Sequence, residues 1–252
     1  MSADIVILAG GSSSRMSSNL PKFLLKIANK PMISHIIDQY KLLNFNNIHV
    51  VTPPKYSNDP ILSNINVVVQ EIPNGNANAL LLTLPYLKSE YTIVQYADMP
   101  LITSEEIITL LKNKGNDAVF IAGILPYNLL KKPYGRVFLK NRQFDKLIEY
   151  IDLTEEQRSQ NLFNTGFYMF KTNILKQYLE KIPYHTGVRE KYITDILEIL
   201  KINNKSIKVV ISNNYYNFHG VNTPEELELA DNIMENRLNL YIKNNNKHYR
   251  II

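Results

Sequence analysis

Short apolar runs rich in β-branched residues alternate with amphipathic segments along the first half of the chain. The runs typical of buried strands are residues 4–8, 47–52, 67–69, 91–95 and 118–123. Between them, residues 32–43 and 77–87 carry apolar side chains at helical spacing, and Thr103 with Glu106 forms a capping box that begins a third helix. Strands that alternate with helices at this spacing predict an α/β fold with a mainly parallel central sheet.

The pattern changes after about residue 130. Residues 136–140 and 144–149 predict a hairpin around Lys140-Asn141-Arg142. The elements predicted beyond the hairpin are strands at 163–170 and 207–211 and helices at 173–181, 192–200 and from Thr223 to about Asn236. We expect one domain over residues 1–236, followed by a polar C-terminal tail over residues 237–252. In such sheets, ligands bind beyond the carboxyl ends of the strands.

Composition excludes several classes of protein. The 252 residues include no cysteine, which rules out disulfides, thiolate metal sites and a cysteine nucleophile. The five histidines are scattered without zinc-ligand spacing. A net charge of +5, spread along the chain, suits an anionic small molecule better than a nucleic acid. No apolar run approaches the roughly 20 residues that span a bilayer, so we expect a cytoplasmic protein with no membrane partner.

The segment after the first predicted strand is the strongest candidate for binding chemistry. Leu8-Ala9-Gly10-Gly11 leads into small residues as far as Arg15, and Pro21-Lys22 follows. Backbone N–H groups in such a loop form a nest for phosphate oxygens, to which Arg15 and Lys22 would add two cations. The spacing is neither that of a P-loop nor that of a dinucleotide fingerprint. An ordinary turn with surface cations stays open as the alternative.

Two oxygen-bearing residues suggest a metal site. Asp98 directly follows the strand at 91–95, and Asn222 follows another apolar stretch. A carboxylate and an amide oxygen, together with phosphates and water, can bind Mg²⁺. Taken alone, an aspartate at this position is more typical of a turn or a helix cap, and it is the presence of Asn222 that favours a metal site.

Several short motifs occur in a particular order. They are the glycine loop with Arg15-Met16 and Pro21-Lys22, Gln70-Glu71 before Gly75, Tyr96-Ala97-Asp98-Met99-Pro100-Leu101, Tyr134-Gly135-Arg136, Ile148-Glu149, Glu155-Glu156-Gln157-Arg158 ahead of Asn164-Thr165-Gly166, Tyr192-Ile193-Thr194-Asp195-Ile196, and Gly220-Val221-Asn222. In this order, over about residues 5–231, the chain resembles the uridylyltransferase domain of the bacterial N-acetylglucosamine-1-phosphate uridylyltransferases, within the sugar-nucleotide pyrophosphorylase superfamily.

The resemblance implies a Rossmann-like nucleotidyltransferase with a smaller β-rich sugar-binding subregion. The implied reaction transfers a uridylyl group from UTP to an N-acetylhexosamine 1-phosphate, with Mg²⁺ as cofactor, and yields a cell wall precursor and pyrophosphate. Arg15 and Lys22 would be the catalytic cations, and Asp98 and Asn222 the Mg²⁺ ligands. The implied nucleotide-binding residues are Leu8, Ala9, Gly10, Gly11, Gln70, Gly75 and Tyr96. The implied sugar-binding residues are Gly135, Glu149, Asn164 and Thr194.

The chain departs from the family pattern at several positions. Ser12-Ser13-Ser14 stands where a glycine and a threonine are usual, and Asn76 and Asn78 replace a threonine and a histidine. Ile151 replaces a lysine, so another cation, such as Arg136 or Arg158, would be needed beside the sugar phosphate. We therefore expect relaxed base choice and weak affinity for the sugar phosphate. The chain shows no hexapeptide repeats, so acetyl transfer is not expected.

Two alternatives stay open. One is a nucleotidyltransferase that uses a different nucleotide or acceptor, such as another sugar 1-phosphate or the molybdenum cofactor. The other is a homologue that binds nucleotide without turnover. Retention of Arg15, Lys22, Asp98 and Asn222 argues against the second alternative.

Overall fold

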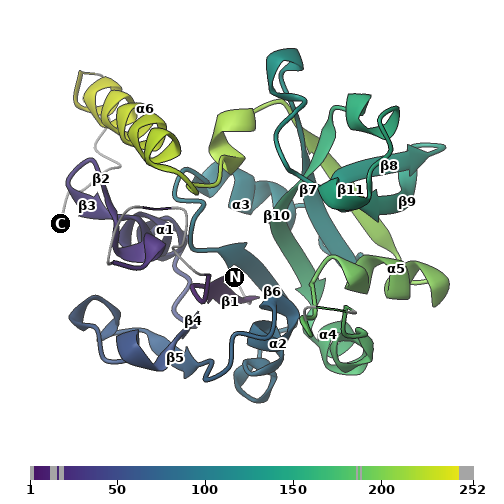
Figure 1. Ribbon diagram of the computed structural model, residues 1–252. Coiled ribbons are helices and arrows are strands. Elements are labelled where there is room, and N and C mark those ends of the chain that lie inside the picture. Colours follow the sequence, from purple (N-terminus) through teal and green to yellow (C-terminus); the bar gives the residue numbers. More distant parts are fainter. Residues whose placement is uncertain (1–2, 12–15, 17–19, 186, 188, 244–252) are drawn as a thin grey trace.

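The structure, a computed structural model, describes residues 3–11, 16, 20–185, 187 and 189–243. Within these residues a nine-stranded sheet has the strand order β11-β7-β10-β6-β1-β4-β5, with β8 and β9 attached beside β10 (Figure 1). The strands are β1 (Ala3–Leu8), β4 (Ile48–Thr52), β5 (Asn66–Val69), β6 (Tyr91–Tyr96), β7 (Ala118–Ile124), β8 (Arg136–Lys140), β9 (Gln143–Ile148), β10 (Leu162–Lys171) and β11 (Ile207–Ser212). A separate hairpin pairs β2 (Lys26–Ile27) with β3 (Lys30–Pro31).

The sheet is mainly parallel, which confirms the predicted α/β fold. β1 pairs in parallel with β4 and β6, β4 with β5, and β7 with β11. β10 runs antiparallel to both of its neighbours, β6 and β7. The carboxyl ends of the parallel strands and the amino end of β10 therefore lie at the same edge of the sheet.

Helices cover both faces of the sheet (Figure 1). In β1, Ile5 and Ile7 point to one face, where α1 (Met32–Leu42) and α3 (Ser104–Leu111) pack. Val6 and Leu8 point to the other face, which is covered by helices α2 (Asn76–Leu81), α4 (Thr172–Tyr178) and α5 (Asp195–Ile202). Apolar residues at successive positions of β1 thus match a strand that is buried on both faces.

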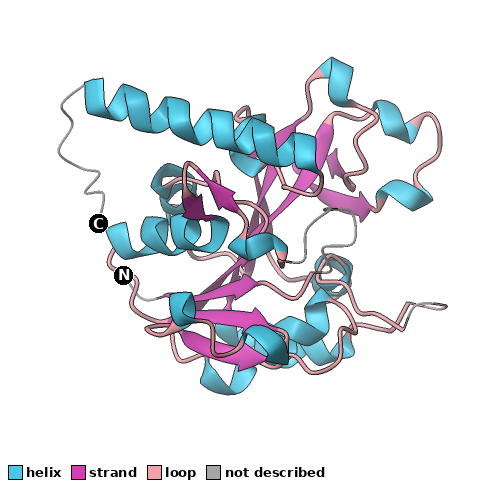
Figure 2. Ribbon diagram, turned by 60° about the vertical axis from the view of Figure 1, so that its left-hand side comes forward, coloured by secondary structure: helices cyan, strands magenta, loops and turns pink. Residues whose placement is uncertain are grey.

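Helix α6 (Pro224–Lys243) forms a third, smaller core with the β2–β3 hairpin, and Figure 2 shows it as the long helix beside that hairpin. The prediction that this helix ends near Asn236 is wrong. Arg237 donates hydrogen bonds to the Leu101 carbonyl at 2.7 Å and to the Asn217 side chain at 2.5 Å, which anchors the following turns. The helices that the structure describes are all too short or too polar to cross a membrane.

Two predicted helix boundaries are also wrong. The helix expected over residues 77–87 ends at Leu81, and a 3-10 turn follows at Leu84–Tyr86. Pro85 explains this end, because proline lacks an N–H and disfavours helical backbone in the residue before it. The helix expected from Tyr192 begins at Asp195, because the N–H groups of Asp195 and Ile196 donate to carbonyls three residues back, so the preceding turn has 3-10 bonding.

Candidate active site

A cavity of about 710 Å³ opens at the carboxyl ends of β1, β4, β5 and β6. This is the sheet edge at which ligands of such folds bind. Among its lining residues are Leu8, Ala9, Gly10, Gly11, Lys22, Gln70, Gly75, Tyr96 and Asp98, all of them predicted site residues. Arg15 and Ser12-Ser13-Ser14 lie outside the described residues, so their roles stay predictions.

The predicted metal ligands converge on one lysine. The Lys22 ammonium donates to Asn222 Oδ1 at 2.7 Å and lies 3.8 Å from Asp98 Oδ2. The Val221 N–H donates to the Asp98 carbonyl at 2.8 Å, which ties the segment before Asn222 to the end of β6. The structure thus brings together a carboxylate and an amide oxygen around a position that already holds a cation.

This arrangement fits Mg²⁺, which binds oxygen ligands and usually takes only one or two from protein carboxylates, the rest coming from phosphates and water. Among the described residues, no group of three or more histidines, aspartates and glutamates could hold a metal unaided. A metal at Asp98 and Asn222 would therefore need oxygens from its substrates.

A turn after β5 forms the predicted base-recognition side of the cavity. Gln70 is 7 % exposed, and its Nε2 donates to Asn74 Oδ1 and to the Gly75 carbonyl, both at 3.2 Å. A Cβ atom on Gly10 would lie 2.9 Å from Gln70 Oε1, so a side chain at position 10 would make the Gln70 amide shift. Gly75 has φ +105°, and a Cβ on it would overlap the backbone of Lys191.

The two asparagines that depart from the family pattern face different partners. Asn76 lines the cavity, and its side chain bonds to the Tyr96 hydroxyl and the Ile193 N–H. Asn78 donates to the Asn74 carbonyl at 2.6 Å and is not among the lining residues. Its amide therefore serves the turn itself rather than the cavity.

The predicted sugar-binding residues come from several elements: Gly135 precedes β8, Glu149 follows β9, Asn164 lies in β10, and Thr194 precedes α5. Gly135 lies opposite Glu149, and the Asn164 N–H donates to the Gly135 carbonyl at 2.9 Å. Burial raises the pKa of Glu149. Burial also raises the pKa of Tyr96, with further contributions from Glu149 and Asp98. Tyr96 is thus influenced by both the sugar-side and the metal-side carboxylates.

An irregularity in β10 shapes this region. The register of β10 against β7 shifts between Asn164 and Tyr168, and Gly166 has φ +78°. A Cβ on Gly166 would clash with the Tyr96 ring. The Asn164 side chain bonds to the Tyr168 hydroxyl at 2.7 Å. The bulge therefore lets β10 pass close to Tyr96 and holds the Asn164 amide in place.

Position 151, where the family has a lysine, and the two arginines named as possible replacements have different surroundings. Ile151 is 86 % exposed. Arg136 is fully buried and donates to the carbonyls of Leu130, Lys132 and Tyr134, so its charge is held inside the fold. Arg158 lies over the Tyr150 ring, with its guanidinium carbon 5.2 Å from the ring centroid.

Sequence reasoning gave no role to Glu190 and Tyr192, which line the cavity. Tyr192 donates to Glu190 Oε2 at 2.7 Å, and this bond is the largest cause that raises the pKa of Tyr192 to about 12. Tyr192 stands two residues before Thr194 in a quoted motif, which was the one available signal. Pro53 and Tyr56 also line the cavity, and nothing in the sequence marked them.

Residues 5–156 match the family of MobA-like NTP transferase domains. Over 241 residues the chain is 32 % identical to the bifunctional protein GlmU of Francisella tularensis subsp. novicida (strain U112). That alignment covers 93 % of this chain and 52 % of the relative, so the chain spans about half the length of the curated relatives it matches. GlmU of Francisella tularensis subsp. holarctica (strain OSU18) matches with the same identity and coverage.

Solved structures share the fold. A Bacillus anthracis protein described as a glucose-1-phosphate thymidylyltransferase, in complex with sucrose, aligns with a TM-score of 0.72 at 19 % identity, covering 92 % of this chain and 94 % of that one. A CMP:2-keto-3-deoxy-manno-octonic acid synthetase in complex with CTP aligns with a TM-score of 0.67 at 20 % identity, covering 94 % of this chain and 100 % of that one. At these identities the likeness establishes the α/β fold.

Proposed function

The chain belongs to the family of MobA-like NTP transferase domains, and from this premise we propose that it transfers a uridylyl group from UTP to an N-acetylhexosamine 1-phosphate, with Mg²⁺ as cofactor. One observation carries the proposal. Lys22, Asp98 and Asn222 meet at the cavity that Gly10, Gly11 and Gln70 line, and Tyr96 links that cavity to the predicted sugar-binding residues.

In the proposed reaction, an oxygen of the acceptor phosphate attacks the α-phosphorus of UTP. The bond from that phosphorus to the oxygen bridging to the β-phosphate breaks, and pyrophosphate leaves. Such a step needs positioning and charge neutralisation rather than a covalent nucleophile. The cavity offers the required groups, namely backbone N–H groups at Gly10 and Gly11 for phosphate oxygens and the Lys22 ammonium for charge on the triphosphate.

Asp98 and Asn222 would hold the metal ion, which, when bound, neutralises charge on the converging phosphates. The Lys22 ammonium bonds to Asn222 and faces Asp98. On the other side of Tyr96, Glu149 and the Asn164 amide offer hydrogen-bonding groups that suit the hydroxyl and acetamido groups of an amino sugar.

The test is pyrophosphate release from a matrix of substrates. UTP, dTTP, CTP and GTP would each be paired with N-acetylglucosamine 1-phosphate, N-acetylgalactosamine 1-phosphate and glucose 1-phosphate, with Mg²⁺ or with EDTA. We expect release that requires Mg²⁺ and is fastest with UTP and an N-acetylhexosamine 1-phosphate. Faster release with another nucleotide or another acceptor would overturn the substrate assignment. Thermal stabilisation by UTP without release from any pair would indicate the non-catalytic alternative.

A further inference from the structure

Asn76 joins three segments of the site that are far apart in the sequence. It is the first residue of α2 and lines the cavity. Its Nδ2 donates to the Tyr96 hydroxyl at 2.9 Å, and its Oδ1 accepts the Ile193 N–H at 2.8 Å. A single side chain therefore links the base-side turn, the end of β6 and the segment that leads into α5.

Backbone hydrogen bonds also join the turn around Gly75 to the segment before α5, and this contact is called the junction below. The Ala77 N–H donates to the Lys191 carbonyl at 3.0 Å, and the Lys191 N–H donates to the Asn74 carbonyl at 3.2 Å. Gly75 leaves no room for a side chain because the Lys191 backbone lies against it. The segment before α5 is thus placed against the base-side turn by main-chain bonds, and the Asn76 amide extends that contact towards Tyr96.

The segment that contacts Asn76 continues into the predicted binding site for the acceptor, the sugar 1-phosphate. Ile193 is fully buried and immediately precedes Thr194, one of the predicted sugar-binding residues. The Tyr96 hydroxyl accepts a hydrogen bond from Asn76, so its own hydrogen is directed away from that amide. Asn76 therefore sets both the place of Thr194 and the direction in which the Tyr96 phenol can donate.

Resting on the proposed function, we propose that Asn76 is a positioning residue for the sugar phosphate, although it stands in the turn that recognises the base. An amide accepts on one atom and donates from another, which lets it span Ile193 and Tyr96 together. A threonine, usual at this position in the family it resembles, has a single shorter hydroxyl. Substitutions at Asn76 therefore weaken binding of the acceptor and leave the preference among nucleotides unchanged.

The experiment compares Asn76→Ala with Asn113→Ala. Asn113 also donates through its side chain, to the Thr109 carbonyl at 2.9 Å, but lies at the far edge of the sheet. We expect Asn76→Ala to raise the KM for the acceptor by about tenfold, the loss of one to two hydrogen bonds, while the KM for UTP and the preference for UTP over CTP change little. Asn113→Ala should change neither KM. A larger change in the UTP KM or in base preference would overturn the proposal.

Amide hydrogen exchange at Ile193 tests the junction without turnover. Exchange should accelerate in Asn76→Ala and stay at the wild-type rate in Asn113→Ala. Because this readout needs no substrate, it separates failure of the junction from failure of the proposed function, which would appear as a wild-type protein inactive with UTP and N-acetylhexosamine 1-phosphates. Wild-type exchange in Asn76→Ala would overturn the proposal.

Asn76→Asp provides a second variant that keeps the side-chain shape. Its carboxylate can still accept the Ile193 N–H, but it cannot donate, so the Tyr96 hydroxyl must turn to donate its own hydrogen. We expect Ile193 exchange to stay slow while the acceptor KM rises. An acceptor KM equal to that of the wild type would show that the direction of the Tyr96 hydroxyl does not matter and would contradict this part of the proposal.

Discussion

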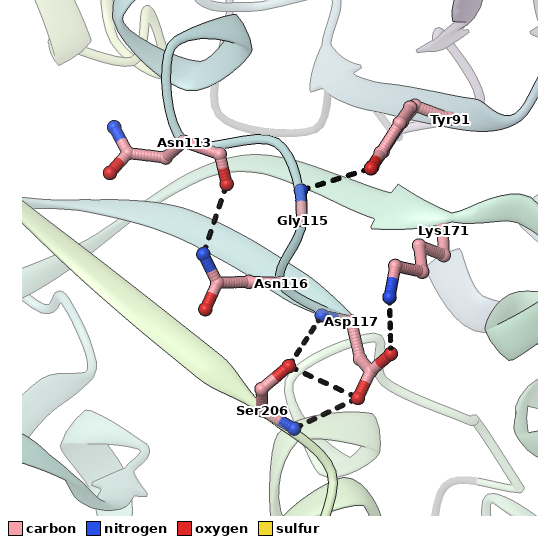
Figure 3. Close-up of polar contacts among 7 residues, drawn as sticks. All are labelled: Tyr91, Asn113, Gly115, Asn116, Asp117, Lys171 and Ser206. Atoms are coloured by element: carbon pink, nitrogen blue, oxygen red, sulfur yellow. Dashed lines mark hydrogen bonds and ion pairs between the residues drawn. The ribbon is translucent and has the colours of Figure 1, made fainter.

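The two edges of the sheet each hold an aspartate that faces a lysine, yet the surroundings of the two pairs differ. At the edge where β7 and β11 begin, Asp117 accepts hydrogen bonds from the Ser206 N–H at 3.0 Å, the Ser206 hydroxyl at 3.1 Å and the Lys171 ammonium at 3.0 Å (Figure 3). These donors come from the ends of neighbouring strands. The carboxylate therefore fastens β7, β10 and β11 together.

At the opposite edge, the distance from the lysine to the aspartate is longer and the groups face a cavity. Lys22 lies 3.8 Å from Asp98 and donates instead to the Asn222 amide oxygen at 2.7 Å. Lys22 and Asp98 both line the cavity. The Lys22–Asp98 pair therefore faces a cavity, whereas Asp117 is bonded to groups at the ends of neighbouring strands.

Electrostatics agrees with this difference at Asp117. Burial alone would raise its pKa, but the bonds from the Ser206 N–H, the Lys171 ammonium and the Ser206 hydroxyl outweigh burial and hold the pKa below its ordinary value. Those bonds favour the charged carboxylate in the folded state and so stabilise the fold. The two ion pairs consist of the same residue types, so what distinguishes them is the groups that surround each pair.

The largest effect should come from removing each aspartate. Asp98→Ala should lower kcat by about 10³-fold or more with little change in stability, because its carboxylate is a proposed metal ligand at the cavity. Asp117→Ala should keep turnover and lower the free energy of unfolding by about 1–3 kcal/mol, since it leaves its donors without an acceptor.

Urea unfolding and pyrophosphate release on both variants provide the comparison. A loss of stability in Asp98→Ala as large as that in Asp117→Ala would abolish the distinction between the two edges.

The two lysines should differ in the same way, with Lys22 affecting turnover and Lys171 affecting stability, but each by less than its aspartate. Lys22→Met should lower kcat by roughly 10²-fold, the range for loss of one preorganised electrostatic contact. Lys171→Met should leave kcat unchanged and lower stability by about 0.5–1.5 kcal/mol, because its partner Asp117 is partly exposed and keeps two other bonds. Steady-state rates at saturating substrate measure the first variant, and unfolding curves the second. Near-wild-type kcat in Lys22→Met would remove that residue from the reaction.

Two glycines with the same positive φ allow a finer comparison. Gly75 and Gly115 both have φ +105°, but a Cβ would overlap the Lys191 backbone at Gly75 and meet nothing within 4 Å at Gly115. Alanine at either position should cost about 1–3 kcal/mol of stability, because L side chains rarely adopt a positive φ of this size. Only Gly75→Ala should also displace the base-side turn, with a fall in kcat/KM for UTP of roughly tenfold to 10²-fold.

Activity and stability of both glycine variants would be measured side by side. An equal fall in kcat/KM in Gly115→Ala would show that backbone strain, and not the contact with Lys191, controls activity.

Much of the fold could be predicted because its signals are local. β-branched runs mark the parallel strands, and the turn at Asn141 and Arg142, both with positive φ, joins the predicted hairpin β8–β9. The site residues were marked by their place after strand ends, as with Gly10 and Asp98. These signals need no knowledge of distant contacts.

The remainder depended on contacts between distant residues. The β2–β3 hairpin turns through Ala28 and Asn29, both with positive φ, and alanine gives no turn signal. The N–H of Ile193 donates to the side chain of Asn76, which is 117 residues away in the sequence. No local pattern predicts such a bond, so the sequence indicated only a base-facing role for Asn76.

The smallest expected effect is on the pH dependence of stability, because the buried histidines and Asp117 lose their contributions in different pH ranges. Burial lowers the pKa of His49, partly offset by Asp4, and burial also lowers the pKa of His35 and His219. For each histidine the unfolded chain binds a proton more readily than the folded chain, so stability should fall as the pH drops below about 6.5. Asp117 loses its contribution in the same direction but at lower pH. Its folded pKa is lowered, so its contribution is present at and above the ordinary carboxyl range near pH 4 and is lost only as the pH falls through its folded pKa.

Urea unfolding at pH 7.5, 6.5 and 5.5 separates the two contributions. His49→Leu should reduce the loss of stability over this interval, because both ring nitrogens of His49 are buried without a hydrogen-bond partner among the described residues and a leucine has no proton to bind. Asp117→Asn should be less stable at every pH in the series, with the same slope as the wild type, since the carboxylate stays ionised throughout. A slope that His49→Leu leaves unchanged would assign the loss to His35 and His219, whereas a slope that changes in Asp117→Asn would contradict the assignment of that carboxylate to a purely structural role at neutral pH.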